Sequence, residues 1–214
     1  MYANCLNFLN TNIRELENDM EEVQNTKHDI RNDMAKAIDS FSKEEIDEKT
    51  SRIETRLFEF ANFLESNISL LYINHDLEVT TRGILDRCLG YNKIVVLPAF
   101  NTETYQMKLM KVDNLDGDLK IGPRRILEPN PVTCKVVPIE RIDIAIIPGV
   151  ALDEKGGRIG SGEGFYDRLI PKLPITTRKV SLAFECQIVQ QIPMESHDKY
   201  VDIIITEKRI IYKI

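Results

Sequence analysis

The sequence predicts an α/β fold with a mostly parallel central sheet that is covered by helices on both faces. From about residue 68 onward, short apolar runs alternate with stretches of helical spacing. The apolar runs are nearly continuous, which is typical of strands buried on both faces. A chain of 214 residues can bury one substantial core and fits one domain better than two.

The apolar runs give the expected strands, at residues 68–73, 93–97, 107–112, 142–147, 180–184, 201–205 and, as an edge strand, 210–214. Thr80 and Thr81 are expected to cap a helix that stops at Gly90. Pro98 is expected to end the strand at residues 93–97. The proline-rich interval 123–138 is expected to be an ordered loop.

The first 65 residues have helical spacing. Apolar residues recur every three or four positions and form a heptad seam at Leu6, Leu9, Ile13, Leu16, Met20 and Val23. We therefore expect a long N-terminal helix, with residues 1–25 as a helical extension and residues 26–214 as one α/β domain. The seam fits self-association or packing on the protein's own body. Ser42 and Glu45 have capping-box spacing and begin a second helix that reaches about Glu65.

Composition narrows the classes of function. A net charge of −6 argues against broad nucleic-acid binding, which needs a basic surface. No apolar run reaches the roughly 18 residues of a membrane span, and no signal peptide is evident, so we expect a cytoplasmic enzyme. The cysteines are widely spaced, which predicts reduced thiols, mostly in the core, at Cys5, Cys88, Cys134 and Cys186.

A glycine-rich segment, residues 149–164, joins the expected strand 142–147 to a helix that begins near Phe165. We call it the glycine loop. Its glycines allow the backbone to adopt positive φ and to turn successive N–H groups toward an anion, at Gly156, Gly157, Gly160, Gly162 and Gly164. The helix start would add free N–H groups. The pattern predicts a phosphate-binding loop; a long flexible turn is the alternative.

Two cations of the N-terminal helix could serve the same anion. Lys27 occupies a seam position, and Arg31 follows four residues later on a neighbouring face. Together they could bind a polyanion. Lys27 could instead be a polar residue within a short coiled coil, or mark a break between two helices.

Acidic residues follow several of the strands. Ligands of parallel sheets bind beyond the carboxyl ends of the strands, so Glu78, Pro98, the glycine loop, Glu185 and Glu207 should share one rim. The Glu78 carboxylate could accept paired hydrogen bonds from an amino-substituted heterocycle. An ordinary solvated loop acid is the alternative for Glu78.

Two aspartates could hold magnesium near a phosphate. Asp167 follows the glycine loop, and Asp202 lies in the strand at 201–205. Magnesium that bridges nucleotide phosphates typically uses one or two carboxylates. Either aspartate could instead form an ion pair with Arg168 or Arg178. No serine, cysteine or zinc-protease motif is present, so the pattern favours chemistry between a nucleotide and a substrate without a covalent nucleophile.

Taken together, these segments resemble the 5-formyltetrahydrofolate cyclo-ligase family, also called methenyltetrahydrofolate synthetases. The resemblance covers about residues 27–207 and lies in Lys27-His28-Asp29-Ile30-Arg31, Leu71-Tyr72-Ile73, Glu78-Val79-Thr80, Lys93 to Pro98, Met107, Ile126 to Pro129, Ile147 to Asp153, Gly157 to Arg168, His197-Asp198 and Val201 to Glu207. The segment from Gly157 to Asp167 is its most specific part.

The resemblance implies a three-layer α/β sandwich that uses ATP and Mg²⁺ to convert 5-formyltetrahydrofolate into 5,10-methenyltetrahydrofolate. It implies ATP binding by Lys27, Arg31, Gly157, Arg158, Ile159, Gly160, Ser161, Gly162, Glu163, Gly164, Phe165 and Tyr166. The reduced folate, which can be polyglutamylated, would meet Ile73, Glu78, Met107, Ser161, Gly162, Phe165 and Tyr166. Magnesium would bind Asp167 and Asp202.

Two residues depart from the family's pattern. Glu163 stands where relatives commonly have glycine or lysine, and its carboxylate would repel ATP unless it points outward or pairs with a cation. Ser161 stands where some relatives have arginine. These departures leave open an alternative function, a non-catalytic folate- or nucleotide-binding paralogue of the same fold. A third hypothesis makes the N-terminal seam an assembly module.

Overall fold

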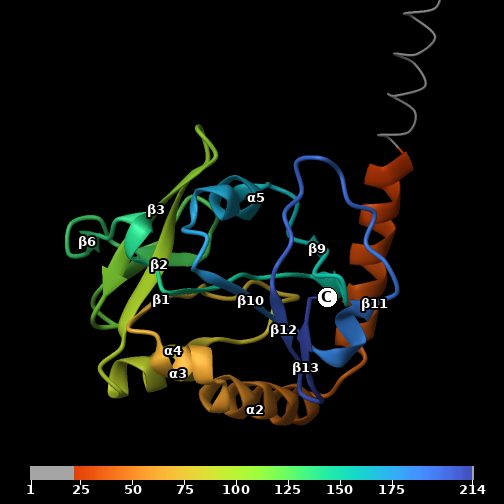
Figure 1. Cartoon of the computed structure of the whole chain (residues 1–214), viewed down its shortest axis with the longest axis horizontal. Coiled ribbons are helices and arrows are strands. Elements are labelled where there is room, and N and C mark those ends of the chain that lie inside the picture. Colours follow the sequence, from red (N-terminus) through yellow and green to blue (C-terminus); the bar gives the residue numbers. More distant parts are fainter. Residues whose placement is uncertain (1–21, 214) are drawn as a thin grey trace, which may run out of the picture.

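The apolar runs form the centre of one eight-stranded sheet in the computed structural model, which describes residues 22–213 (Figure 1). The strand order is β13-β12-β10-β7-β1-β2-β3-β6. The parallel strands are β1 (Ile68–Leu70), β2 (Ile94–Asn101), β7 (Ile144–Ile146), β10 (Arg178–Leu182) and β12 (Ile203–Ile205). Antiparallel strands flank them: β3 (Gln106–Val112) and β6 (Lys135–Val136) on one side, and β13 (Ile210–Tyr212) on the other.

Two layers of helix cover the two faces of this sheet, as predicted (Figure 1). Successive strand residues point to opposite faces, so Ile144 and Ile146 join one core cluster while Ala145 and Ile147 join the other. The first cluster includes side chains of α2 (Lys43–Glu59), α3 (Ala61–Glu65) and α4 (Arg82–Gly90). The second includes α5 (Phe165–Leu169) and the 3-10 helix η2 (Ile170–Lys172). The predicted sandwich is confirmed.

A third, smaller core joins the N-terminal helix to a three-stranded sheet. The helix is described over residues 22–39 and runs unbroken through Lys27 and through the expected boundary after residue 25. Its Met34 and Ile30 pack with β8 (Ala151–Asp153) and β9 (Arg158–Ile159), beside β11 (Ile188–Val189). This part of the seam therefore packs on the protein's own body. The seam positions from Leu6 to Met20 lie outside the described residues.

Several element boundaries differ from the predictions. The second helix starts with the predicted capping box at Ser42 and Glu45, but Phe60 is extended and separates α2 from α3. Strand β2 continues through Pro98 to Asn101. This is possible because β1 pairs only with residues 94–96, so the missing N–H of Pro98 interrupts no bond to β1. Thr81 is the N-cap of α4, yet its hydroxyl donates to the Tyr72 carbonyl instead of capping.

The proline-rich interval is ordered and contains strands as well as loops. A two-stranded hairpin is formed by β4 (Leu119–Ile121) and β5 (Leu127–Pro129), and β6 follows it. Short 3-10 helices lie at η1 (Ile139–Arg141) and η3 (Glu185–Gln187). Cys88, Cys134 and Cys186 are free thiols, the first two buried, as predicted, whereas Cys5 lies outside the described residues. Within residues 22–213, no helix combines the length and apolarity needed to cross a bilayer.

Candidate active site

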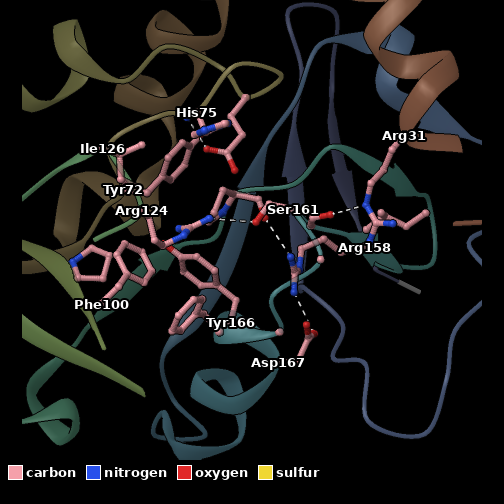
Figure 2. Close-up of a pocket in the computed structure, with 18 of the residues that line it drawn as sticks. Arg31, Tyr72, His75, Phe100, Arg124, Ile126, Arg158, Ser161, Tyr166 and Asp167 are labelled. Atoms are coloured by element: carbon pink, nitrogen blue, oxygen red, sulfur yellow. Dashed lines mark hydrogen bonds and ion pairs between the residues drawn. The ribbon is translucent and has the colours of Figure 1, made fainter. Parts of the chain in front are cut away.

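A pocket lies beyond the carboxyl ends of β1 and β7 and beside the second half of β2. Residues of the glycine loop, of the turn of the β4–β5 hairpin and of the helix at residues 22–39 line it (Figure 2). Its free space measures about 960 Å³, including space that is open to solvent. Glu78, Pro98 and the glycine loop share this rim as predicted. Glu185 and Glu207 do not line it. Outside the pocket, the Glu207 carboxylate accepts a hydrogen bond from the Glu185 backbone N–H.

The glycine loop is a fixed turn in this structure, not a flexible one. The buried Asp153 carboxylate accepts hydrogen bonds from the backbone N–H groups of Lys155, Gly157 and Ile192, at 3.0, 2.8 and 2.8 Å. Gly156 has φ 84°, and a Cβ there would stand 2.3 Å from the Val201 carbonyl oxygen. Only glycine fits that position. These contacts hold the first part of the loop, from residue 153 to residue 157, directly before the residues that line the pocket.

Arginine and lysine side chains surround the loop. Arg158 is buried; it donates to the Pro148 carbonyl at 3.2 Å and to Asp167 Oδ1 at 2.9 Å, while its buried Nε has no partner among residues 22–213. Arg31 Nε donates to the Gly160 carbonyl at 2.9 Å (Figure 2). Burial lowers the pKa of Arg31, and the nearby Asp198 carboxylate opposes that shift. Two guanidinium groups are thus placed against the loop backbone.

Lys27 also lines the pocket, but its ammonium is already paired. Nζ lies 2.6 Å from Glu195 Oε2 and 2.5 Å from Asp198 Oδ2. Burial disfavours the charge on Asp198, yet hydrogen bonds from the Glu195 N–H and from Lys27 hold its pKa below the usual value. Lys27 therefore fastens the N-terminal helix to the segment 195–198. A phosphate could be bound there only alongside these acids or in their place.

Glu78 lines the same pocket, together with several aromatic side chains. Its Oε2 accepts from the His75 N–H at 2.9 Å. Burial raises the pKa of Glu78, although the His75 N–H and the charges of Arg124 and Arg158 oppose the shift. The hydroxyl of Tyr166 is buried and has no hydrogen-bond partner in the part of the chain that the structure describes, and burial raises its pKa. A carboxylate and an unpartnered hydroxyl in one pocket suit a polar heterocycle.

Arg124 is the main pocket residue that sequence reasoning missed. It lies in the turn of the β4–β5 hairpin and reaches the glycine loop, where its guanidinium bonds Ser161 Oγ at 3.2 Å and Glu163 Oε2 at 2.5 Å. It also stacks over the rings of Phe100 and Phe165, at 4.6 and 5.4 Å from their centroids. The only signal in the sequence is the Arg124-Arg125 pair after Pro123, and nothing there indicates its partners.

Comparison with known proteins agrees with this geometry. The model of the 5-formyltetrahydrofolate cyclo-ligase family matches residues 23–207. The chain belongs to this family. A cyclo-ligase from Escherichia coli K12 is 26% identical over 172 residues, which cover 80% of this chain and 94% of that protein. One from Haemophilus influenzae is 34% identical over 129 residues, which cover 60% of this chain and 69% of that one.

Solved structures of cyclo-ligases have the same fold. The 5,10-methenyltetrahydrofolate synthetase of Aquifex aeolicus superposes with a TM-score of 0.76 at 28% identity, over 87% of this chain and 92% of that one. The synthetase from Mycoplasma pneumoniae has a TM-score of 0.67 at 17% identity, over 85% of this chain and 98% of that one, and supports the fold alone.

Most of the residues that the cyclo-ligase resemblance assigns meet in this one pocket: Lys27, Arg31, Ile73, Glu78, Arg158, Ile159, Gly160, Ser161, Gly162, Gly164, Phe165, Tyr166 and Asp167. Gly157 and Glu163 belong to the loop without lining the pocket. Met107 lies in a neighbouring groove, on the other side of Phe165, which lines both hollows.

The structure does not bring the predicted magnesium pair together. Asp167 lines the pocket, and of its two oxygens Oδ1 is occupied by Arg158 and by the Lys199 N–H. Asp202 does not line the pocket; its Oδ2 accepts from the backbone N–H and the ammonium of Lys179, both at 2.9 Å. Magnesium accepts a single carboxylate when phosphate and water complete its shell, so Asp167 fits this ion and Asp202 does not in the arrangement seen.

Proposed function

We propose that this cyclo-ligase family member converts 5-formyltetrahydrofolate and ATP into 5,10-methenyltetrahydrofolate, ADP and phosphate. The observation that carries the proposal is that one pocket gathers two kinds of group. Glu78 and the Tyr166 hydroxyl, which has no hydrogen-bond partner among the described residues, suit a heterocycle, whereas the glycine loop, Arg31 and Arg158 suit phosphates. A site that orients two ligands and neutralises phosphate charge needs no covalent nucleophile.

We infer the following order of bond formation and bond breaking. The formyl oxygen attacks the γ-phosphorus of ATP, and ADP leaves. N10 of the folate then attacks the activated formyl carbon and loses its proton, and the carbon–oxygen bond to phosphate breaks. The glycine loop and the guanidinium groups of Arg31 and Arg158 would bind the phosphates. Glu78 would orient the pterin ring by accepting its hydrogen bonds.

Magnesium would supply charge neutralisation between the nucleotide phosphates, and Asp167 would hold it. Because Arg158 is tied to Asp167, the cation that binds phosphate and the carboxylate that binds metal would be fixed relative to each other. That Lys27 binds phosphate remains a prediction. That Asp202 binds magnesium also remains a prediction.

The alternative, a binding paralogue without ligase activity, is motivated by Glu163 and Ser161. Glu163 meets the condition under which it would not repel ATP, because its carboxylate pairs with Arg124 at 2.5 Å. Ser161 Oγ accepts a hydrogen bond from the same guanidinium. Arg124 therefore brings an arginine to the position at which some relatives carry arginine in the loop itself. These contacts favour the enzyme over the paralogue.

Isotope transfer tests the proposed chemistry. When 5-formyltetrahydrofolate carries ¹⁸O in its formyl group, we expect the ¹⁸O in the released phosphate after one turnover with Mg-ATP. Methenyl product with unlabelled phosphate would contradict phosphorylation of the formyl oxygen. An absence of product with folded protein would instead favour the binding paralogue.

A further inference from the structure

The glycine loop carries a negative charge that a phosphate-binding loop should not tolerate. Glu163 lies between Gly162 and Gly164, both of which have positive φ (103° and 68°). An unpaired carboxylate at this position would repel a triphosphate by Coulomb interaction across a few ångströms. The repulsion is avoided if Glu163 points away from the phosphates or pairs with a cation.

Arg124 is the cation that meets Glu163 in this structure. Their side chains are 14% and 37% exposed, and the 2.5 Å contact joins two segments that are 39 residues apart. The same guanidinium donates to Ser161 Oγ at 3.2 Å, so it bonds the loop on both sides of Gly162. In Figure 2, Arg124 lies between Phe100 and Ser161, with a dashed line to Ser161.

The aromatic rings beneath Arg124 fix its position. Phe100 and Phe165 meet edge to face, with centroids 4.9 Å apart, and the guanidinium stacks over both. The two rings and the oxygen acceptors of Ser161 and Glu163 restrict the Arg124 side chain. Little further rotamer entropy is then lost when this side chain is ordered around a ligand. The guanidinium is therefore placed before any ligand binds.

The hairpin that presents Arg124 is itself anchored. Glu128 of β5 is buried and accepts from the Phe100 N–H at 3.0 Å. Gly122 lies so close to the Glu128 carboxyl group that a Cβ would stand 2.1 Å from its carbon. A close backbone approach of this kind requires glycine. The turn from residue 122 to residue 126 is thus a fixed arm with Arg124 at its end.

We propose that Arg124 is a positioning residue for nucleotide binding: it neutralises Glu163 and locks the glycine loop to the β4–β5 hairpin, so that the loop accepts phosphates despite its acidic residue. This inference rests on the proposed function, because it takes the glycine loop to be the phosphate site. Arg124 acts through Glu163 and Ser161, and its effect should therefore depend on Glu163.

A double-mutant cycle tests that dependence. Binding of Mg-ATP is measured by calorimetry without folate for Arg124→Met, Glu163→Gln and the double variant. Arg125→Met is the matched control, because Arg125 is exposed on the same turn and has no ion pair among the residues described. We expect Arg124→Met to weaken ATP binding roughly 10-fold, as one unpaired charge near phosphates would. The control should change binding less than about twofold.

The decisive comparison is the double variant. If Arg124 works by neutralising Glu163, Arg124→Met should have little effect once Glu163 is glutamine, and ATP affinity should return to within about threefold of the Glu163→Gln value. Steady-state kinetics should show a higher KM for ATP in Arg124→Met and a smaller change in KM for the folate.

Two results would overturn the inference: unchanged ATP affinity in Arg124→Met, or a double variant as weak as Arg124→Met alone. Thermal stabilisation by inorganic tripolyphosphate, measured on the same four variants, repeats the comparison without folate chemistry. If the unsubstituted protein binds tripolyphosphate but forms no methenyl product, the proposed function is wrong. The order of the four variants in thermal stabilisation by tripolyphosphate still tests the role of Arg124.

Discussion

Lys27 shows how one residue can be recognised in the sequence while its surroundings are not. Its place in an apolar seam predicted a special role, and the structure places its ammonium, only 6% exposed, between Glu195 and Asp198. These acids come from a segment about 170 residues away, so local spacing could not reveal them. A buried cation with two carboxylates stabilises the fold only while all three groups are charged.

The first prediction concerns this cluster. Lys27→Met should lower the free energy of unfolding at pH 7 by about 2 kcal/mol, because two carboxylates lose their cation. The Asp198 pKa is depressed, so its contribution is complete above the unfolded value near 3.9 and is lost as the pH falls below that value. The difference in stability between Lys27→Met and the unsubstituted protein should therefore narrow below about pH 4, in urea titrations.

Lys36→Met is the control for this experiment, because the Lys36–Asp33 pair is mostly exposed and should contribute little. Lys27→Met should also weaken ATP binding more than folate binding if the phosphate role assigned by resemblance holds. A stability difference that stays constant from pH 7 to pH 3 would contradict the role of the Lys27 pairs.

The second prediction concerns Glu78. Burial raises its pKa in the folded protein, so the ionised form opposes folding above that pKa and the penalty disappears below the unfolded value near 4.3. Glu78→Gln should therefore be more stable than the unsubstituted protein at pH 7 and equal to it below about pH 4. Folate binding should weaken by about tenfold or more, because charge-assisted hydrogen bonds to the pterin are lost.

Urea unfolding at the two pH values and calorimetric folate titrations check this prediction, with exposed Glu65→Gln as the control. If Glu78→Gln kept full folate affinity, Glu78 would be a structural acid of the pocket wall and the pterin assignment would be wrong.

At the scale of elements, the helix at residues 22–39 is what completes the pocket. It supplies Lys27 and Arg31, and it is held on the small sheet by Met34, which packs near Val150, Ile159 and Ile192. Within residues 22–39, the continuation of the seam through Lys27, Ile30 and Met34 correctly predicted a helix with a buried stripe. Periodicity could not distinguish a partner copy from the protein's own β8 and β9, because both present an apolar surface.

Met34→Ala should release this helix. We expect the free energy of unfolding to fall by about 2 kcal/mol, with amides of residues 22–39 exchanging faster than those of α2. The KM for ATP should rise more than the KM for folate, because only the phosphate end of the pocket uses this helix. Asn32→Ala, exposed on the same helix, serves as the control. Unchanged exchange in Met34→Ala would show that other contacts hold the helix.

Seven strands of the central sheet were predictable because each is a short, mostly apolar run, and the order of layers followed from their alternation with helices. The short strands β4, β5, β6, β8, β9 and β11 were not predicted. The boundaries were less predictable. Nothing in the sequence around Phe60 marks the interruption between α2 and α3, and Pro98 stops a strand only when its missing N–H faces a partner strand. The partners of Arg124 could not be found from spacing, since the turn and the loop meet only in the folded chain.

At the scale of the whole molecule, the fold collects residues from six distant segments into a single pocket, and the family's residue pattern predicted many of them. The exceptions are informative. Asp202 bonds Lys179 instead of facing the pocket, and Met107 lies beyond Phe165. A motif identifies the residues that a family shares. The position of each side chain also depends on neighbouring residues that are particular to this chain.

Every pocket residue described here lies at or after Gln24. A chain that begins at residue 22 should therefore keep its turnover within about twofold, and steady-state kinetics of the shortened and full chains test this. Light scattering of both chains shows whether the seam from Leu6 to Met20 holds copies together: the mass falls on shortening only if it does. Loss of turnover in a folded, shortened chain would show that residues 1–21 contribute to the site.

The central claim is that this pocket joins ATP to a formyl folate. The most direct measurement follows absorbance as the purified protein meets 5-formyltetrahydrofolate and Mg-ATP, because the methenyl product carries a new conjugated chromophore. We expect an absorbance rise that requires ATP and is reduced at least tenfold in Glu78→Gln and in Arg158→Met. Folded protein that binds both ligands and forms no methenyl product would contradict the account.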